Sequence, residues 1–98
     1  MEKNNLYGPI VGHVGDGNFH VQLMIDPEIQ KEVDVANDFL ERLAHRAINM
    51  DGTCTGEHGV GQGKKQYLLD ELGPAVDFMK LIKQELDPKG IMNPGKIL

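Results

Sequence analysis

Two histidines seven residues apart are the first side chains in this sequence whose spacing points to chemistry. His13 and His20 lie in the segment GHVGDGNFH, on either side of Gly15-Asp16-Gly17. An Asp-Gly pair between alternating apolar residues is a strong signal for a two-residue hairpin turn. With Asp16 and Gly17 at the centre of that turn, His13 faces His20, with Cβ atoms about 4.5–5.5 Å apart. This register predicts that two imidazoles can share one ion.

A third donor is available from Glu57, which belongs to the alternating series Thr53, Thr55 and Glu57 of an expected extended segment. Two neutral imidazoles and a carboxylate suit Zn²⁺, Mn²⁺ or Fe²⁺, and three protein ligands leave a position open for substrate. The same pattern also fits the polar outer face of a hairpin on which histidine is merely tolerated. Spacing alone leaves both interpretations open.

The glycine-rich stretch GEHGVGQGKK is a second candidate for ligand binding. A Walker phosphate loop requires glycine where His58 stands, and the glycines do not fit the dinucleotide fingerprint. What remains is a flexible backbone that carries Glu57 and His58 between glycines, which permit close approach to a ligand. A plain surface loop explains the stretch equally well.

Two further polar features favour structural roles. Cys54 has no neighbouring base in the sequence, so we expect a small, buried residue and not a nucleophile. As the single cysteine, it cannot form a disulfide within the chain. Lys64 and Lys65 are expected at a solvated helix start.

The elements that must position these residues follow from the apolar pattern. We expect a hairpin over residues 10–25 whose core side carries the set Ile10, Val14, Phe19, Val21, Leu23 and Ile25. Asp26 is expected to cap a helix that begins at Pro27 and ends near Met50, with Gly52 as a left-handed cap. Its apolar stripe comprises Ile29, Val33, Ala36, Phe39, Leu40, Leu43, Ala44, Ala47 and Ile48.

The second half of the sequence predicts a short strand over residues 53–57 and two shorter helices near residues 64–72 and 74–86. A turn is expected at Asp87-Pro88-Lys89-Gly90, and the tail cannot be helical across Asn93-Pro94. The predicted fold class is therefore α+β: an antiparallel hairpin and a short strand with helices.

Length and composition exclude several classes of protein. The chain has 98 residues, 40% of them hydrophobic and 5% aromatic, and a formal net charge of −5. That is room for one small domain. Clustered Lys and Arg are missing from the sequence, which argues against a nucleic-acid partner and against a membrane-surface protein. No apolar stretch reaches the roughly 20 residues of a transmembrane helix.

Three segments, GHVGDGNFH, TCTGEHGVGQGKKQ and LDPKGIMNPGKIL, occur in this order. They resemble the C-terminal end of FAD-linked oxidases that act on D-2-hydroxy acids, and the likeness runs from about Gly12 to Leu98. Glycolate oxidase subunits and D-2-hydroxyglutarate dehydrogenases share the segments, but the wording TCTGEHG and GNFH favours the flavin-dependent D-lactate dehydrogenases.

The resemblance implies roles for individual residues. His13, His20 and Glu57 are expected to bind a divalent metal, Zn or Mn, which is the trio that the hairpin register suggests. His58 is expected to be the active-site base and to contact substrate. Gln22 stands where D-2-hydroxyglutarate dehydrogenases have a substrate-contacting Asn, so it is a substrate-binding candidate. The change from Asn to Gln weakens the case for a dicarboxylate substrate. Two residues of the tail are expected toward the flavin: Asn93 and Lys96.

The resemblance also implies a place in a larger protein. Residues 1–98 are expected to be a partial domain, the end of the substrate (cap) domain plus helices that return to an FAD-binding domain absent from this sequence. The isolated fragment is expected to bind no FAD, to be inactive, and to self-associate through exposed apolar faces.

In the complete protein, D-lactate is expected to become pyruvate while FAD takes the hydride. The electrons then pass to a quinone, cytochrome c or electron-transfer flavoprotein. The protein is expected to be soluble. Its expected location is the cytoplasm or the periphery of the bacterial inner membrane, or the mitochondrion in a eukaryote. The alternatives are a stand-alone metal-binding module without redox activity, a small metal-dependent hydrolase that uses Glu57 or His58 as base, and a fragment of a glycolate oxidase or D-2-hydroxyglutarate dehydrogenase.

Overall fold

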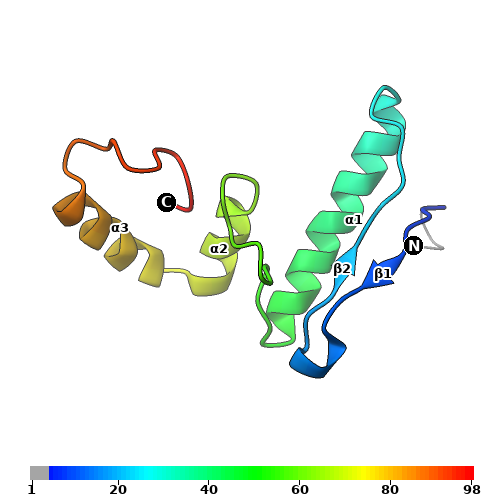
Figure 1. Ribbon diagram of the computed structural model, residues 1–98, viewed down its shortest axis with the longest axis horizontal. Coiled ribbons are helices and arrows are strands. Elements are labelled where there is room, and N and C mark those ends of the chain that lie inside the picture. Colours follow the sequence, from blue (N-terminus) through cyan, green and yellow to red (C-terminus); the bar gives the residue numbers. More distant parts are fainter. Residues whose placement is uncertain (1–4) are drawn as a thin grey trace. The chain divides into compact units, whose positions relative to one another are not determined.

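The computed structural model describes residues 5–98 and confirms an α+β fold (Figure 1). A two-stranded antiparallel sheet is formed by β1 (Ile10–Val11) and β2 (His20–Val21), with a 3-10 helix (Val14–Asp16) between them. Three α-helices follow: α1 (Gln30–Asn49), α2 (Lys65–Leu72) and α3 (Ala75–Leu86). The chain divides into two compact units, Met1–Leu43 and Ala44–Leu98, with the boundary inside α1.

The hairpin is present, but its predicted two-residue turn is wrong. Ile10 pairs with Val21 and Val11 with His20, and the carbonyl of His13 accepts hydrogen bonds from the amides of Asp16 at 2.9 Å and Asn18 at 3.1 Å. The turn is therefore four residues long and built on the 3-10 helix. A two-residue type I′ turn needs two consecutive residues with positive φ, and here only Gly17, at φ 71°, adopts one.

The predicted core side of the hairpin is correct only for its last three residues. Val21, Leu23 and Ile25 are half-buried, whereas Ile10, Val14 and Phe19 are exposed. Val14 leaves the strand alternation because it begins the 3-10 helix.

Helix α1 begins three residues later than predicted, but Asp26 does organise its start. The Asp26 carboxylate accepts a hydrogen bond from the amide of Glu28 at 2.9 Å, and its own amide donates to the Glu32 carboxylate at 2.7 Å. This reciprocal arrangement resembles a capping box. A turn closed by the Ile29 amide on the Asp26 carbonyl precedes the first helical residue. On the predicted apolar stripe, Ala36 is buried.

The end of α1 is a Schellman motif, displaced by one residue from the prediction. Asp51, and not Gly52, has the positive φ, at 61°. The Gly52 amide donates to the Ala47 carbonyl at 2.8 Å and the Asp51 amide to the Ile48 carbonyl at 3.0 Å. Asp tolerates the left-handed region better than most residues. Gly52 is needed for a different reason: a Cβ there would lie 2.9 Å from the Ala47 carbonyl oxygen.

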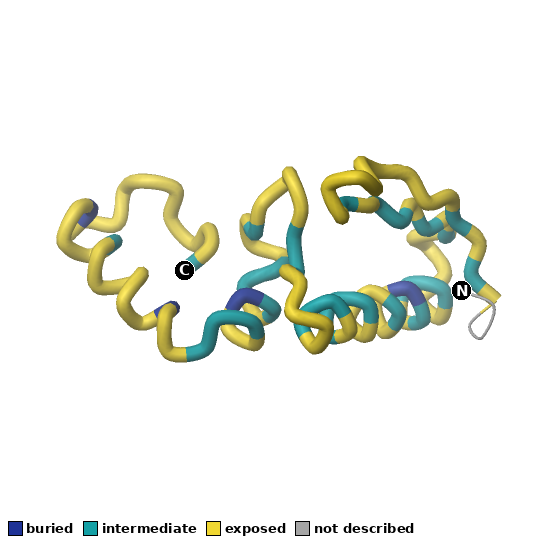
Figure 2. The backbone as a smooth tube through the Cα atoms, turned by 90° about the horizontal axis from the view of Figure 1, so that it is seen from below, coloured by how far each residue is buried: buried dark blue, intermediate teal, exposed yellow. Residues whose placement is uncertain are grey.

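The second unit contains the two predicted shorter helices, with bounds within one residue of those expected. Leu68 on α2 and Val76 on α3 are its buried apolar side chains among the residues described (Figure 2). The predicted strand over residues 53–57 is wrong, since this segment forms bends and turns. The Thr55 hydroxyl donates to the Gly59 carbonyl at 2.6 Å, and this local bond takes the place of a strand partner.

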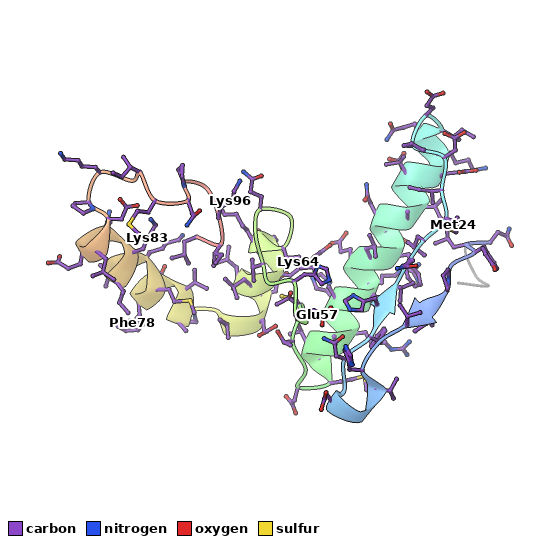
Figure 3. The ribbon with its side chains drawn as sticks, in the orientation of Figure 1. Met24, Glu57, Lys64, Phe78, Lys83 and Lys96 are labelled. Atoms are coloured by element: carbon purple, nitrogen blue, oxygen red, sulfur yellow. The ribbon has the colours of Figure 1, made fainter. Side chains whose placement is uncertain are left out.

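The chain after α3 follows the prediction. The Gly90 amide closes the turn on the Asp87 carbonyl at 3.0 Å, and residues 91–98 form no helix. Several apolar side chains of α3 are exposed, among them Phe78 at 67% (Figure 3). Across residues 5–98, no helix combines the length and the apolar character required to cross a bilayer.

Replacing Gly52 by alanine tests the Schellman motif. The added Cβ meets a backbone carbonyl, so we expect Gly52→Ala to lower the free energy of unfolding by about 1 kcal/mol or more in urea titration. Gly63→Ala is the matched control, because open space surrounds Gly63. Equal midpoints for Gly52→Ala and wild type would contradict the close approach.

Candidate functional site

The two histidines of the hairpin are not directly opposite each other, so the predicted register is wrong. His20 pairs with Val11, whereas His13 lies two residues beyond Val11, after β1 has ended, and directly precedes the 3-10 helix. The shift comes from the longer turn. His20 is half-buried and His13 is exposed.

Glu57 and His58 lie next to each other in the glycine-rich loop, which begins directly after the bends at residues 53–56 (Figure 3). Glu57 Oε1 is 3.5 Å from His58 Nε2, and the side chains are 54% and 74% exposed, respectively. The loop owes its course to Gly59, at φ 76°, and to the bond from the Thr55 hydroxyl. A carboxylate and an imidazole are therefore presented together on an open loop.

The predicted metal ligands belong to two different units of the chain. His13 and His20 belong to the first unit and Glu57 and His58 to the second, and each pair offers its ligand atoms at or near the surface. Imidazole nitrogens with a carboxylate oxygen are donors that Zn²⁺ and Mn²⁺ accept.

The other predicted binding residues occupy two places. Gln22 is exposed and follows His20 on the same hairpin face. Its backbone amide donates to the Pro9 carbonyl at 3.0 Å. Asn93 lies in the tail at φ 45°, and its carbonyl accepts the Lys96 amide at 3.3 Å. Asn93 and Lys96 thus belong to one local turn.

Cys54 is partly buried, in keeping with a structural role. Its amide donates to the Glu71 carboxylate at 2.7 Å. Burial, followed by the negative charge of Glu71, raises the pKa of the Cys54 thiol. Partial burial also acts to raise the pKa of Glu71, but hydrogen bonds from Cys54 and Thr53 outweigh it and lower that pKa. A protonated thiol beside an ionised carboxylate is a poor nucleophile.

Sequence reasoning missed a polar cluster where the end of α1 meets α2. His45 Nε2 lies 3.1 Å from the Asp70 carboxylate, which also accepts a hydrogen bond from Gln66 at 3.2 Å. The Tyr67 ring packs edge-on against His45, with centroids 6.0 Å apart. His45 and Asp70 are too far apart in sequence for their spacing to predict this contact. The available sequence signal was His45 itself, a polar residue beside the apolar stripe of α1.

Comparison with known proteins follows the sequence motifs. The family described as "FAD linked oxidases, C-terminal domain" matches residues 1–97. The chain is 57% identical over 97 residues to the probable mitochondrial D-lactate dehydrogenase of Danio rerio, covering 98% of this chain and 20% of that protein. It is 51% identical over 98 residues to the mitochondrial D-lactate dehydrogenase (cytochrome) 1 of Saccharomyces cerevisiae, covering 99% of this chain and 16% of that protein.

A relative named for a different activity is less similar to this chain. The chain is 40% identical over 87 residues to the glycolate oxidase subunit GlcD of Bacillus subtilis, which covers 88% of this chain and 18% of that protein. The chain thus spans about a fifth or less of the length of these curated relatives.

The environment of Cys54 predicts slow alkylation. With its pKa raised, the thiol is less ionised at about pH 8 than an exposed cysteine. We expect Glu71→Gln to raise the rate of reaction with iodoacetamide by about two- to fivefold, because it removes the neighbouring charge. Glu85→Gln, on the exposed face of α3, is the control. A native rate equal to that of the urea-unfolded chain would contradict the prediction.

Proposed function

We propose that this chain, which belongs to the family of the C-terminal domains of FAD-linked oxidases, is the substrate- and metal-binding part of an FAD-dependent dehydrogenase that converts D-lactate to pyruvate. The observation that carries the proposal is the 57% identity over 97 residues to a protein named as a D-lactate dehydrogenase. Glycolate is the competing substrate, favoured by the weaker likeness to a glycolate oxidase subunit.

His13, His20 and Glu57 are the residues that we propose as metal ligands. The positions of His13 and His20 on either side of the hairpin turn and the exposed loop position of Glu57 support the assignment. A divalent ion, Zn or Mn, supplies Lewis acidity toward the carboxylate and hydroxyl oxygens of a 2-hydroxy acid when bound.

His58 is the proposed base. Oxidation of an alcohol requires loss of the hydroxyl proton, and an exposed imidazole can accept it at a ring nitrogen. The Glu57 carboxylate oxygen lies 3.5 Å from the ring nitrogen Nε2 of His58. Gln22 is proposed to contact substrate, because it lies on the same hairpin face as His20.

FAD, held mainly by upstream sequence, supplies the hydride acceptor when bound. Asn93 and Lys96 are proposed to lie on its side of the site. Three curated relatives are named as cytochrome-linked and mitochondrial, which supports a cytochrome as electron acceptor and a mitochondrial location for the parent protein.

Metal titration of this chain tests the proposed ligands. We expect zinc to bind wild type, and His20→Ala and Glu57→Ala each to weaken that binding at least about tenfold by calorimetry. His45→Ala is the matched control, because this histidine is engaged with Asp70. Binding should weaken from about pH 8 to about pH 5, since imidazole must be neutral to bind a metal. Equal affinity of wild type and His20→Ala would overturn the site.

Turnover in the complete protein tests the proposed base. With this chain joined to its upstream sequence, we expect His58→Ala to lower kcat for D-lactate by about 10²–10⁴, the usual worth of general-base catalysis. Metal content, measured by elemental analysis, should stay close to that of wild type. Glu57→Ala should lose both metal and activity.

Two results would count against these roles. Loss of metal from His58→Ala as complete as from Glu57→Ala would make His58 a ligand. A kcat/KM for glycolate above that for D-lactate would replace the proposed substrate.

A further inference from the structure

The carboxylate of Asp87 is hydrogen-bonded through both of its oxygens and has no part in the proposed chemistry. It follows α3 directly, and its side chain is only 4% exposed. Oδ1 accepts the Ile91 amide at 3.0 Å, and Oδ2 accepts the Met92 amide at 3.0 Å. The Lys83 ammonium forms an ion pair with the same Oδ2.

Lys83 strengthens this arrangement from the last turn of α3. Its Nζ also donates to the Met92 carbonyl at 2.7 Å, so one ammonium contacts both the carboxylate and the tail (Figure 3). The hydrogen bond from Lys83, followed by that from the Met92 amide, lowers the pKa of Asp87. The buried carboxylate is therefore ionised at neutral pH and is matched by donors on both oxygens. Together these bonds set the direction in which the tail, residues 91–98, leaves α3.

The far end of the tail is fixed to the glycine-rich loop. The Ile97 amide donates to the Gly61 carbonyl at 2.7 Å, and Lys65 Nζ lies 3.5 Å from the Gly95 carbonyl. Ile97 has φ 65°, a strained conformation for a β-branched residue. Strain of this kind persists only where surrounding contacts impose it. The tail thus runs from the end of α3 back to the loop (Figure 1).

The contacted loop is the one that carries Glu57 and His58. Gly61 lies three residues after His58, and the Lys64 amide bonds to the Val60 carbonyl at 3.3 Å where the loop enters α2. The loop is otherwise closed by the bond from Thr55 to Gly59. The Ile97 contact joins the second half of the loop, by a backbone hydrogen bond, to a segment distant in sequence.

We propose that Asp87 is a positioning residue: together with Lys83 it directs the tail so that Ile97 reaches Gly61 and fixes the loop that bears Glu57 and His58. The structural part of this proposal, that Asp87 positions the tail and the loop, is argued from the tail contacts alone. Its consequence for activity rests on the proposed function. Asparagine cannot replace Asp87, because its amide group would present donors to the Met92 amide or to Lys83. Glutamate keeps the charge and should restore part of the effect.

Hydrogen exchange on the 98-residue chain tests the structural part. In Asp87→Asn we expect the protection of the Ile91, Met92 and Ile97 amides to fall at least about tenfold, while that of the α3 interior stays within about twofold. Asp87→Glu should recover part of the Ile97 protection, and Glu85→Gln should match wild type. Faster exchange at Ile91 and Met92 with unchanged protection at Ile97 would overturn the proposal.

A second variant alters the other end of the tail and serves as the test if Asp87→Asn fails to fold. Deletion of Ile97 and Leu98 leaves Asp87 and Lys83 intact. We expect the Ile91 and Met92 amides to keep their protection, while the Lys64 amide exchanges faster by about tenfold. Unchanged exchange at Lys64 would overturn the link between tail and loop.

The complete protein separates this proposal from the proposed function. There we expect Asp87→Asn to lower kcat for D-lactate with a smaller change in KM, and Asp87→Glu to restore part of kcat. A wild-type complete protein that does not oxidise D-lactate would refute the proposed function, and the exchange measurements would still decide the positioning role.

Discussion

Hydrogen bonds at helix ends hold the loops of this protein in place, because few side chains are available to do so by burial. Among the described apolar residues, only Ala36, Leu68 and Val76 are buried. A chain of this size buries a smaller share of its surface than a large domain does. The course of each connection therefore depends on local polar closures: Asp26 before α1, the Schellman motif after it, and the Asp87 carboxylate after α3. Each closure satisfies backbone groups that a helix end leaves without partners.

The small number of buried apolar side chains agrees with membership of a family of C-terminal domains. Helix α3 leaves Phe78, Leu81 and Ile82 more than half exposed, and the relatives extend well beyond the length of this chain. Apolar faces of this extent are typical of surfaces that meet another part of a protein. The expected self-association of the isolated chain and its proposed role within a longer flavoprotein both rest on these exposed apolar faces.

The candidate site places its chemical groups on the least regular parts of the structure. His13 and His20 flank the hairpin turn, and Glu57 and His58 lie on an open loop. Loops can present side chains to a substrate, but they must be held by a scaffold to do so. In the second unit that scaffold is α3 and the tail, since one end of the tail is fixed by Asp87 and the other reaches Gly61. Binding groups and supporting groups are therefore different residues.

The sequence by itself determined the class of fold, the three helices, the turn after α3 and the family, because helix periodicity, proline and glycine positions and short motifs are local signals. It predicted His13, His20, Glu57 and His58 as the chemical groups. Tertiary structure decided what local signals do not encode: the four-residue turn that moves His13 out of line with His20, and the loop in place of a strand at residues 53–57. It also decided the pairing of His45 with Asp70 and the tail contact of Ile97 with Gly61. These contacts join residues far apart in the chain, and their geometry depends on how whole elements pack.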